Sequence, residues 1–271
     1  MSLGSAKAVI VSVGSDIGQA IAKEWIARGV EIVGTFRTES EQIDDLKRLG
    51  VGLVQCDLSS PSSLRTAEEQ LEERSRDWTI LILAAGSLEP IGHFEHTGIE
   101  LWESSFAVNF FSQVRLISRL LPTRSTSTTP IVIAFAGGGI NSAPTETSAY
   151  TLSKYALVKL MELLAAETSD VAFVSVGPGW VHTKIHDGAL AAGVEQSSIA
   201  ARTRERLQDG PLVEMQRVVD CCSWLVSVPP DAITGRNFSV ADDAWGSESL
   251  LMRLKSNPDQ FKLRRVCDTR D

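Results

Sequence analysis

The sequence of 271 residues has few cysteines, few aromatic residues and no long apolar run. Its cysteines, Cys56, Cys221, Cys222 and Cys267, show neither CxxC spacing nor the density of a disulfide scaffold. No segment approaches the ~20 apolar residues of a membrane-spanning helix. These absences argue against a disulfide-rich or membrane-embedded protein and favour reduced thiols in the cytoplasm. The adjacent cysteines are expected in an amphipathic helix, with one thiol facing inward.

Basic residues are scarce relative to acidic ones, since 26 Lys and Arg face 34 Asp and Glu, for a net charge of −8. A nucleic-acid-binding surface needs a dense basic patch, and the one basic cluster, residues 262–265, is short and typical of a solvated tail. His182 and His186 stand four residues apart without a third ligand, so no metal site is predicted. The expected partner is a small-molecule substrate, with no nucleic acid and no membrane.

The chain does contain a regular alternation of short β-branched runs and helix-length segments, with 43% apolar residues. Several runs are apolar nearly throughout, as in strands that are covered on both faces. This order predicts an α/β fold in a single domain, with a Rossmann-like, doubly wound parallel sheet in three layers. The expected strands are residues 8–13, 31–36, 52–56, 79–84, 130–135, 171–176 and 238–240, and the expected helices are residues 16–29, 41–49, 61–74, 99–121, 148–168 and 213–226.

The alternation stops after residue 176, and the next segment is irregular apart from one amphipathic helix expected at 197–207. Ligands of open α/β sheets bind at the carboxyl ends of the strands. A segment of about 182–212 that leaves this edge is therefore predicted to form a substrate lid. A surface excursion without a closing motion is the alternative. Residues 1–6 are expected to be tag-derived or disordered, residues 7–242 to form the domain, and residues 243–271 to be a weakly periodic extension.

Tyr150 and Lys154 are the most informative pair in the chain. Their spacing of four residues places both side chains on one face of the expected helix. A neighbouring cation favours the phenolate and lowers the pKa of a tyrosine from its ordinary value near 10. Such a phenol can exchange a proton with a carbonyl or alcohol oxygen near neutral pH. In isolation, the same pair would also describe two ordinary residues on a solvated helix.

A turn rich in glycine and serine joins the first expected strand to the first helix. Backbone N–H groups and the positive end of the helix dipole bind phosphate at such junctions. Turns of this composition are common, and the position at the first strand–helix junction is what favours a dinucleotide site. The residues expected to contact the cofactor here are Ser12, Gly14, Ser15, Asp16, Ile17 and Gly18.

Residues after the second and third strands bear on the adenosine half of such a cofactor. Asp57, next to Leu58, is expected to accept a hydrogen bond from adenine. Capping of the following helix is the alternative, although Ser59 or Ser60 can also fill that role. Arg37 lies where an acidic residue would favour the free ribose of NAD. Because arginine can bind a 2′-phosphate, the sequence favours NADP(H) over NAD(H), unless Arg37 is merely solvent-exposed.

Together these features resemble the short-chain dehydrogenase/reductases over residues 7–242. Tyr150 and Lys154 look like the catalytic pair of that family, and Asn109 looks like its active-site asparagine. The further motifs, in chain order, are Ala84-Ala85-Gly86 where the family has Asn-Ala-Gly, Pro178-Gly179 followed by Thr183, and Ile233-Thr234-Gly235 as a late turn.

The resemblance implies hydride transfer between a nicotinamide cofactor and a substrate carbon. Tyr150 would be the general acid and base, and Lys154 would bind the nicotinamide ribose and lower the pKa of the tyrosine. Asn109 would hold a water that relays protons towards Lys154. The nicotinamide side of the cofactor would be contacted by Ala84, Ala85, Gly86, Pro178, Gly179, Val181 and Thr183.

The glycine turn departs from the family pattern. The first two family glycines fall on Ser12 and Asp16, and only Gly18 remains. Gly14 is expected to supply the missing backbone freedom. Asp16 is expected to face away from the phosphates and to cap the helix.

The position of the family's catalytic serine, thirteen residues before the tyrosine, is occupied by Gly137. Three accounts stay open. A backbone N–H of the run 137–139 donates instead, as in oxyanion holes. Alternatively, Gly137 and Gly138 make room for a bulky substrate with polar groups of its own, or catalysis has decayed. Because Asn109, Tyr150 and Lys154 persist, we expect a working enzyme, and a large rate increase on Gly137→Ser would show that the glycine site had lost the usual function.

Two functions follow from these features. The first is an NADP(H)-dependent oxidoreductase acting on a secondary alcohol or ketone. The run 137–139 and the segment 261–265 resemble a subgroup found in surface-polysaccharide and sugar biosynthesis, which suggests a sugar or nucleotide sugar. The second is a catalytically weakened cofactor-binding or regulatory protein, favoured by Gly137 and Asp16.

The resemblance also implies a homodimer or homotetramer, formed through the helices that hold Asn109 and Tyr150. The apolar residues that permit such an interface, and that would equally suit burial within one subunit, are Leu157, Leu160, Leu163 and Leu164.

Overall fold

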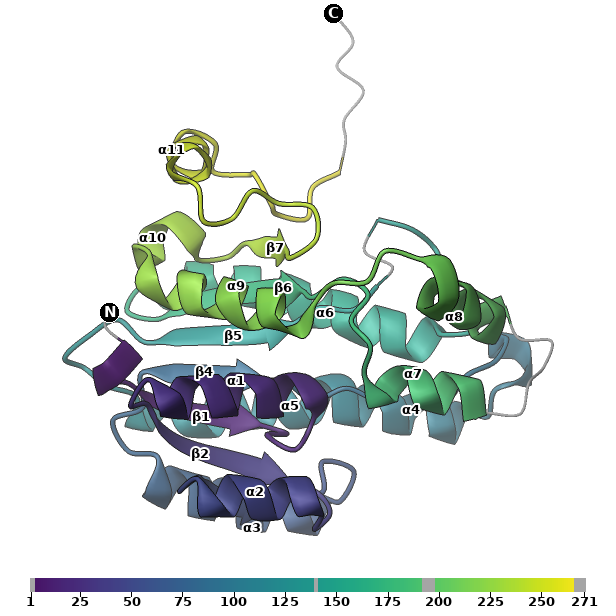
Figure 1. Ribbon diagram of the computed structural model, residues 1–271, viewed down its shortest axis with the longest axis horizontal. Coiled ribbons are helices and arrows are strands. Elements are labelled where there is room, and N and C mark those ends of the chain that lie inside the picture. The colour runs from purple at the N-terminus through teal and green to yellow at the C-terminus, as the bar shows by residue number, and fades with distance from the viewer. Residues whose placement is uncertain (1–2, 139–140, 192–197, 266–271) are drawn as a thin grey trace, which may run out of the picture.

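A seven-stranded parallel sheet forms the centre of the molecule, as the alternation of apolar runs predicts (Figure 1). The computed structural model describes residues 3–138, 141–191 and 198–265. The strand order is β3-β2-β1-β4-β5-β6-β7, so the chain reverses its direction of winding between β1 and β4. The strands are β1 (Lys7–Val11), β2 (Glu31–Phe36), β3 (Gly52–Gln55), β4 (Ile80–Leu83), β5 (Ile131–Phe135), β6 (Ala172–Gly177) and β7 (Asn237–Ser239).

Helices cover both faces of the sheet, which gives the three layers expected (Figure 1). Successive residues of a strand point to opposite faces. Ala8 and Ile10 accordingly join one apolar core, and Val9 and Val11 join the other. The first core is covered by α1 (Asp16–Ala27), α2 (Glu41–Arg48) and α9 (Met215–Ser227), and the second by α3 (Pro61–Arg74), α5 (Ser112–Leu120) and α6 (Ser148–Glu167).

Serine side chains begin three of these helices. Ser15, Ser40 and Ser60 each accept a hydrogen bond from a backbone N–H in the first turn of the helix that follows. Such caps satisfy N–H groups that have no partner within the helix. They also position each helix start directly after the carboxyl end of a strand, where the predicted cofactor site lies.

The helix predicted over residues 99–121 is divided in three. α4 (Ile99–Phe106) leads into a π-helical turn, η3 (Ala107–Phe111), and this turn leads into α5. Asn109 stands within the π-helical turn. Single π-helical turns inside α-helices often occur at functional sites, and hydrophobic periodicity alone did not reveal this one.

Two helices, not one, leave the carboxyl edge of the sheet after β6. They are α7 (Lys184–Ala191), which the sequence did not predict, and α8 (Ser198–Asp209), which matches the amphipathic helix expected at 197–207. The Glu146 carboxylate accepts hydrogen bonds from the backbone N–H groups of Ser198 and Ile199 at the start of α8. The lid predicted at 182–212 thus consists of this helix pair, and its closing motion stays a prediction.

The described residues near each end of the chain pack against the domain. A short 3₁₀ turn, η1 (Leu3–Ser5), precedes the buried Ala6, whose carbonyl accepts a hydrogen bond from the Glu31 backbone N–H. Residues 3–6 are therefore not a free tail. In the extension, α11 (Glu248–Ser256) buries Leu250 and Leu254 in the first core.

Buried Arg236 fixes this extension to the domain. It follows the four-residue helix α10 (Pro230–Ile233) and donates hydrogen bonds to the carbonyl groups of Leu254 and Asn257. Weak periodicity in the sequence did not reveal this attachment, because its anchor is a charged residue that no apolar pattern indicates.

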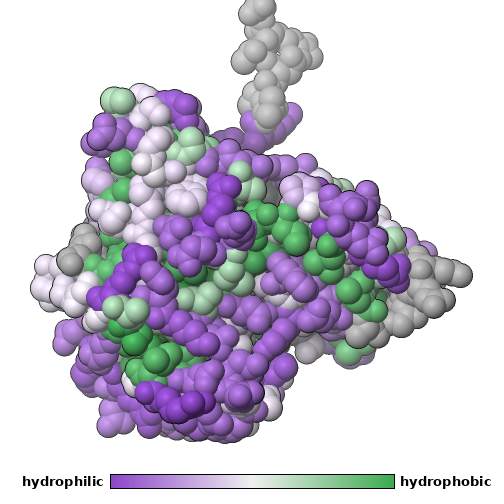
Figure 2. Space-filling model, in the orientation of Figure 1, coloured by the Kyte–Doolittle hydropathy of each residue, from purple (hydrophilic) through white to green (hydrophobic). Residues whose placement is uncertain are grey.

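Both cysteines of α9 are fully buried, whereas one thiol of the pair was expected to face solvent. The reason is that α9 is covered on two sides, by the sheet and by α1, so that it has a wider apolar face than an amphipathic surface helix. Within the described residues, no helix combines the length and the apolar character needed to cross a membrane. Figure 2 shows mostly hydrophilic residues on the visible face, with hydrophobic residues gathered in a band across its middle.

Candidate active site

The predicted site residues come together along one edge of the sheet, because parallel strands all end on the same side. Ser12 follows β1, Arg37 follows β2, and Asp57 lies just beyond β3. On the other side of the reversal point, the segment 84–86 follows β4 and Gly137 lies just beyond β5. Pro178, Gly179, Val181 and Thr183 lie beyond the end of β6.

Tyr150 lies directly against Gly137. A Cβ atom built on Gly137 would stand 2.9 Å from the Tyr150 hydroxyl oxygen and 2.8 Å from the ring carbon Cε1. Real Cβ atoms do not approach other atoms so closely, so the tyrosine ring occupies the space that a serine side chain would need. Gly138, by contrast, has no neighbour among the described residues within 4 Å of such an atom. A larger residue at position 137 therefore needs the Tyr150 ring to move, and glycine lets the ring stay where it is.

Lys154 extends from the same helix to the ends of two strands. Its Nζ donates to the carbonyl oxygen of Ala85 at 2.7 Å and to that of Phe135 at 3.1 Å. The side chain is 3% exposed. Two backbone carbonyls thus hold an ammonium group in the interior, between β4 and β5, one turn along α6 from Tyr150.

The pKa values of this pair correct the sequence-based expectation. Burial raises the pKa of Tyr150 to about 12, whereas Lys154 was expected to lower it. Burial also lowers the pKa of Lys154 to about 8. Both shifts share one cause, since removal of water disfavours the charged form of an acid and of a base alike. In this state the phenol is a neutral proton donor, and the lysine titrates close to physiological pH.

Asn109 is held by protein groups on every side. Its Oδ1 accepts from the Ser87 backbone N–H and its Nδ2 donates to the Ser87 carbonyl, both at 2.8 Å. Its own carbonyl accepts from Gln113 Nε2 at 2.7 Å. The asparagine therefore connects the π-helical turn to the segment after β4. The Gln113 amide occupies the Asn109 carbonyl, so it competes there with the water that the family resemblance places on this asparagine.

The glycine turn has close packing at Gly18, but its residue with positive φ is not the one expected. A Cβ atom on Gly18 would stand 2.5 Å from the Ser12 carbonyl oxygen, so no larger residue fits there. The positive φ of the turn, 61°, belongs to Ser12 and not to Gly14, contrary to expectation. Gly14 instead leaves room for Ile43, whose Cδ1 would be 3.0 Å from an added Cβ atom. Such a turn against a helix N-terminus fits a pyrophosphate group.

Asp16 has a partner that the sequence did not reveal. Ser15 caps α1, so Asp16 is not the cap. The Asp16 carboxylate accepts a hydrogen bond of 2.7 Å from the backbone N–H of Lys184, the first residue of α7. It therefore connects the phosphate-binding turn to the predicted lid.

Arg37 and Asp57 lie at the end of the sheet edge where the adenosine half of the cofactor is predicted. Ser60 caps α3, which removes helix capping as the role of Asp57. Asp57 accepts from the Ser59 backbone and hydroxyl, and these hydrogen bonds, helped by the charge of Arg37, lower the pKa of its carboxyl group. Arg37 is exposed, and within the described part of the chain it forms no ion pair at 4 Å or less. Leu58 is buried, and its carbonyl accepts from the Ser112 hydroxyl at 2.7 Å.

The segment after β6 contacts the lid helices. Gly179 has a φ of 76°, a left-handed conformation that favours glycine, and Val181 is buried. The Thr183 hydroxyl lies 3.3 Å from Nδ1 of His186. The His186 ring stacks on Trp180, with ring centroids 5.1 Å apart.

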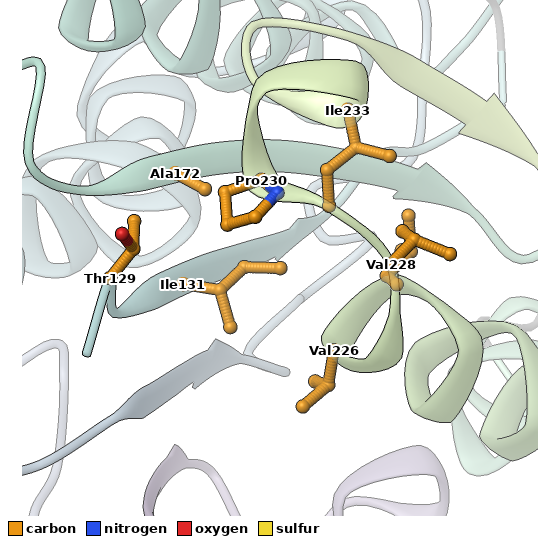
Figure 3. Close-up of a pocket in the computed structure, with 8 residues that line it drawn as sticks. Thr129, Ile131, Ala172, Val226, Val228, Pro230 and Ile233 are labelled. Carbon is orange, nitrogen blue, oxygen red and sulfur yellow. The ribbon is translucent and has the colours of Figure 1, made fainter. Parts of the chain in front are cut away.

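The opposite edge of the sheet holds a small apolar cavity, shown in Figure 3. It lies at the amino ends of β5 and β6, so it is separated from Tyr150 by the length of those strands. It contains no titratable side chain and is not the active site. Its lining residues are Thr129, Ile131, Ala172, Leu225, Val226, Val228, Pro230 and Ile233.

Comparison with known proteins identifies relatives of this chain. The protein family described as enoyl-(acyl carrier protein) reductase matches residues 12–242. The short chain dehydrogenase pgmD of Aspergillus terreus is 27% identical over 265 residues, covering 89% of this chain and 80% of that protein. A benzil reductase of Saccharomyces cerevisiae is 33% identical over 137 residues, which cover 48% of this chain and only about half, 52%, of that enzyme.

A solved structure gives the same fold. A short chain dehydrogenase/reductase from Saccharomyces cerevisiae superposes with a TM-score of 0.78 at 21% identity, covering 89% of this chain and 98% of that one. At this identity the similarity establishes the arrangement of the sheet and helices.

Proposed function

The chain belongs to the short-chain dehydrogenase/reductase family of oxidoreductases, and from this premise we propose that it is an NADP(H)-dependent enzyme for ketones or secondary alcohols. The family uses nicotinamide cofactors. When bound, the cofactor supplies or receives the hydride. The protein must then supply or remove a proton at the substrate oxygen.

The observation that carries this proposal is the Tyr150–Lys154 pair at the ends of β4 and β5. A phenol with a pKa raised to about 12 is neutral at physiological pH and can donate its proton to a developing alkoxide. Lys154, held by the Ala85 and Phe135 carbonyls, would bind the nicotinamide ribose and stabilise the phenolate that remains. Gly137 lets the tyrosine ring approach the end of β5 and leaves substrate positioning to groups other than a serine hydroxyl.

Arg37 supports NADP(H) as the cofactor. It is exposed at the end of β2, and its guanidinium can bind a ribose phosphate with paired hydrogen bonds. Asp57 lies across the same edge and would receive the adenine amino group. Exchange of Arg37 for alanine should weaken NADPH binding about tenfold and leave NADH binding within about twofold.

The substrate that we propose is a ketone or the corresponding secondary alcohol. The relative named benzil reductase acts, by its name, on an aromatic diketone, and a structural neighbour is named aldohexose dehydrogenase. A sugar or nucleotide sugar, suggested by the sequence, belongs to the same reaction class. A neutral diketone and a sugar are therefore the first two substrates to compare.

A catalytically weakened cofactor-binding protein is the alternative. Its support is Asp16, a carboxylate placed at the phosphate-binding turn and engaged by Lys184, and the raised pKa of Tyr150. In that case the cofactor binds but no substrate is turned over.

We also propose a homodimer or homotetramer in the cytoplasm. Leu157 is fully buried in the subunit's own core, so it is not available for an interface. Leu163 on the same helix and Phe111 beside Asn109 are 48% and 57% exposed. Exposed apolar side chains on the helices that carry the site residues are suited to contact with a second subunit.

The test combines binding and turnover. NADPH and NADH would be titrated by cofactor fluorescence into the wild type, Arg37→Ala and Tyr150→Phe. Oxidation of NADPH would then be followed with benzil, and reduction of NADP⁺ with aldohexoses and nucleotide sugars. Tight NADPH binding with turnover that Tyr150→Phe reduces at least 1000-fold supports the enzyme, by analogy with the loss of other catalytic groups. Binding without oxidation or reduction of the cofactor across the panel would favour the alternative.

A further inference from the structure

Gln113 lies next to the catalytic residues without being part of the predicted site. It stands four residues after Asn109 at the start of α5 and is 0% exposed. Its Nε2 donates to the Asn109 carbonyl at 2.7 Å and lies 3.4 Å from the carbonyl oxygens of Val108 and Ala85. Three acceptors around one NH₂ group define the orientation of the amide, because the reversed amide would face its oxygen towards carbonyl oxygens.

The Ala85 carbonyl is the point where Gln113 and Lys154 meet. Lys154 Nζ donates to this oxygen at 2.7 Å, and Gln113 Nε2 approaches it at 3.4 Å. A carbonyl oxygen has two lone pairs and can accept both donors. One side-chain amide therefore bridges the π-helical turn that holds Asn109 and the end of β4 that anchors the ammonium group.

The oxygen of the same amide, Oε1, contributes no stability that would explain a glutamine at this position. Within the described residues, no donor reaches the buried Gln113 Oε1. An unpaired amide oxygen in the interior costs free energy, and methionine or leucine would fill a similar volume without this cost. Positions that break a rule of stable packing are expected at functional sites. The amide at position 113 is thus better explained by what its Nε2 holds in place.

We propose that Gln113 is a positioning residue for the catalytic pair: its amide fixes the Asn109 and Ala85 carbonyls relative to each other and so places the Lys154 ammonium group. The role of Lys154 in turnover rests on the proposed function. By occupying the Asn109 carbonyl, Gln113 makes the connection towards Lys154 that the family resemblance assigns to a bound water.

Gln113→Met tests this role, since it keeps the length of the side chain and removes the amide. We expect kcat to fall about tenfold, with little change in the KM for the ketone, because a displaced ammonium group affects the reacting state more than substrate binding. In ¹⁵N-lysine NMR spectra, the titration of Lys154 should also move. Gln113→Glu should shift that titration to higher pH, because a carboxylate favours a nearby ammonium ion.

Gln216→Met is the matched control, since Gln216 is exposed on α9 and bonds only to Asp220 among the partners found for it. It should leave the rate and the Lys154 titration unchanged. A Gln113→Met protein with lower thermal stability but wild-type kcat and wild-type Lys154 titration would overturn the positioning role. If Gln113→Met does not fold, an unchanged Lys154 titration in Gln113→Glu overturns it equally.

The two proposals fail in different ways. If the wild type oxidises no cofactor with any substrate while the Lys154 titration still responds to both Gln113 variants, the proposed function is wrong and the positioning role stands. If the wild type turns over and the Gln113 variants match it in rate and in the Lys154 titration, the positioning role is wrong and the proposed function stands.

Discussion

The two halves of the active-site edge hold their polar groups in opposite ways. In the catalytic half, Lys154, Asn109 and Gln113 are buried and bonded to backbone groups of other elements. In the cofactor half, Arg37 is exposed and Asp57 bonds to a residue two positions away. Chemistry in the first half is therefore set by desolvation, and in the second by local turns and helix starts.

This difference explains which groups have strongly shifted pKa values. Burial displaces the pKa of both Tyr150 and Lys154, to about 12 and about 8. The pKa of the Asp57 carboxyl group is lowered mainly by hydrogen bonds from its neighbour Ser59. A change in the catalytic half should therefore disturb several groups at once, whereas a change in the cofactor half should remain local.

Among substitutions that leave Tyr150 and Lys154 themselves in place, the largest effect is expected from Gly137→Ser. The added side chain must displace the Tyr150 ring, whose hydroxyl oxygen would be 2.9 Å from the new Cβ atom. Turnover should fall about 100-fold, because small displacements of a catalytic group cost about this much. A large rate increase, which would show that the glycine site had lost the usual function, is therefore not expected. Steady-state kinetics measure it, and Gly138→Ser, which has open space around its Cβ position, controls for folding by its melting temperature. A faster Gly137→Ser enzyme would contradict the proposed packing.

A smaller effect is expected from pH, through Lys154. Its pKa is about 8 in the folded chain and near 10.5 ordinarily. Between these values the unfolded chain binds a proton at this lysine that the folded chain does not, so Lys154 contributes a rise in the free energy of unfolding of about 2 kcal/mol from pH 8 to about pH 10. The buried thiols of Cys56, Cys221 and Cys222, whose pKa values burial raises, contribute a fall over the same range. The expected result is therefore a difference: in denaturant unfolding, the wild type should gain about 2 kcal/mol relative to Lys154→Met between these pH values. Lys23→Met, on the exposed side of α1, should follow the wild type, and equal slopes in wild type and Lys154→Met would contradict the desolvated lysine.

The smallest effect is expected in the cofactor half, from Ser12→Gly. Ser12 has a φ of 61°, which costs a residue with a Cβ atom free energy that glycine does not lose. The free energy of unfolding should rise by roughly 0.5–1 kcal/mol in chemical denaturation. Ser12→Ala keeps the Cβ atom and should give no gain. A stabilised alanine variant, or a loss in the glycine variant, would show that the serine hydroxyl matters more than backbone strain.

Much of the fold was predictable from the sequence because its signals are local. β2 and α3 begin and end where the sequence predicts, since an apolar run ends at a polar residue and a serine–proline pair starts the helix. The spacing of Tyr150 and Lys154 likewise required only helical periodicity. Gln113 stood at the same spacing from Asn109, so a closer inspection of that helix could have found it.

The errors share a physical cause. No local pattern indicated that Arg236 anchors the extension, that Asp16 binds the start of α7, or that Gly137 packs on Tyr150, because each contact joins residues distant in the chain. The predicted shift in the pKa of Tyr150 had the wrong direction, because the prediction considered the charge of Lys154 and not the loss of water on burial.

The order of strands and helices, the edge of the sheet where ligands are predicted to bind and the residue types gathered there all follow from the amino-acid sequence, because periodicity and strand polarity are properties of neighbouring residues. Which groups are desolvated, which carbonyls hold Lys154 and how Gly137 packs against Tyr150 follow only from the folded arrangement. Burial and close contact depend on elements from different parts of the chain packing together, and free energies of desolvation follow from that packing alone.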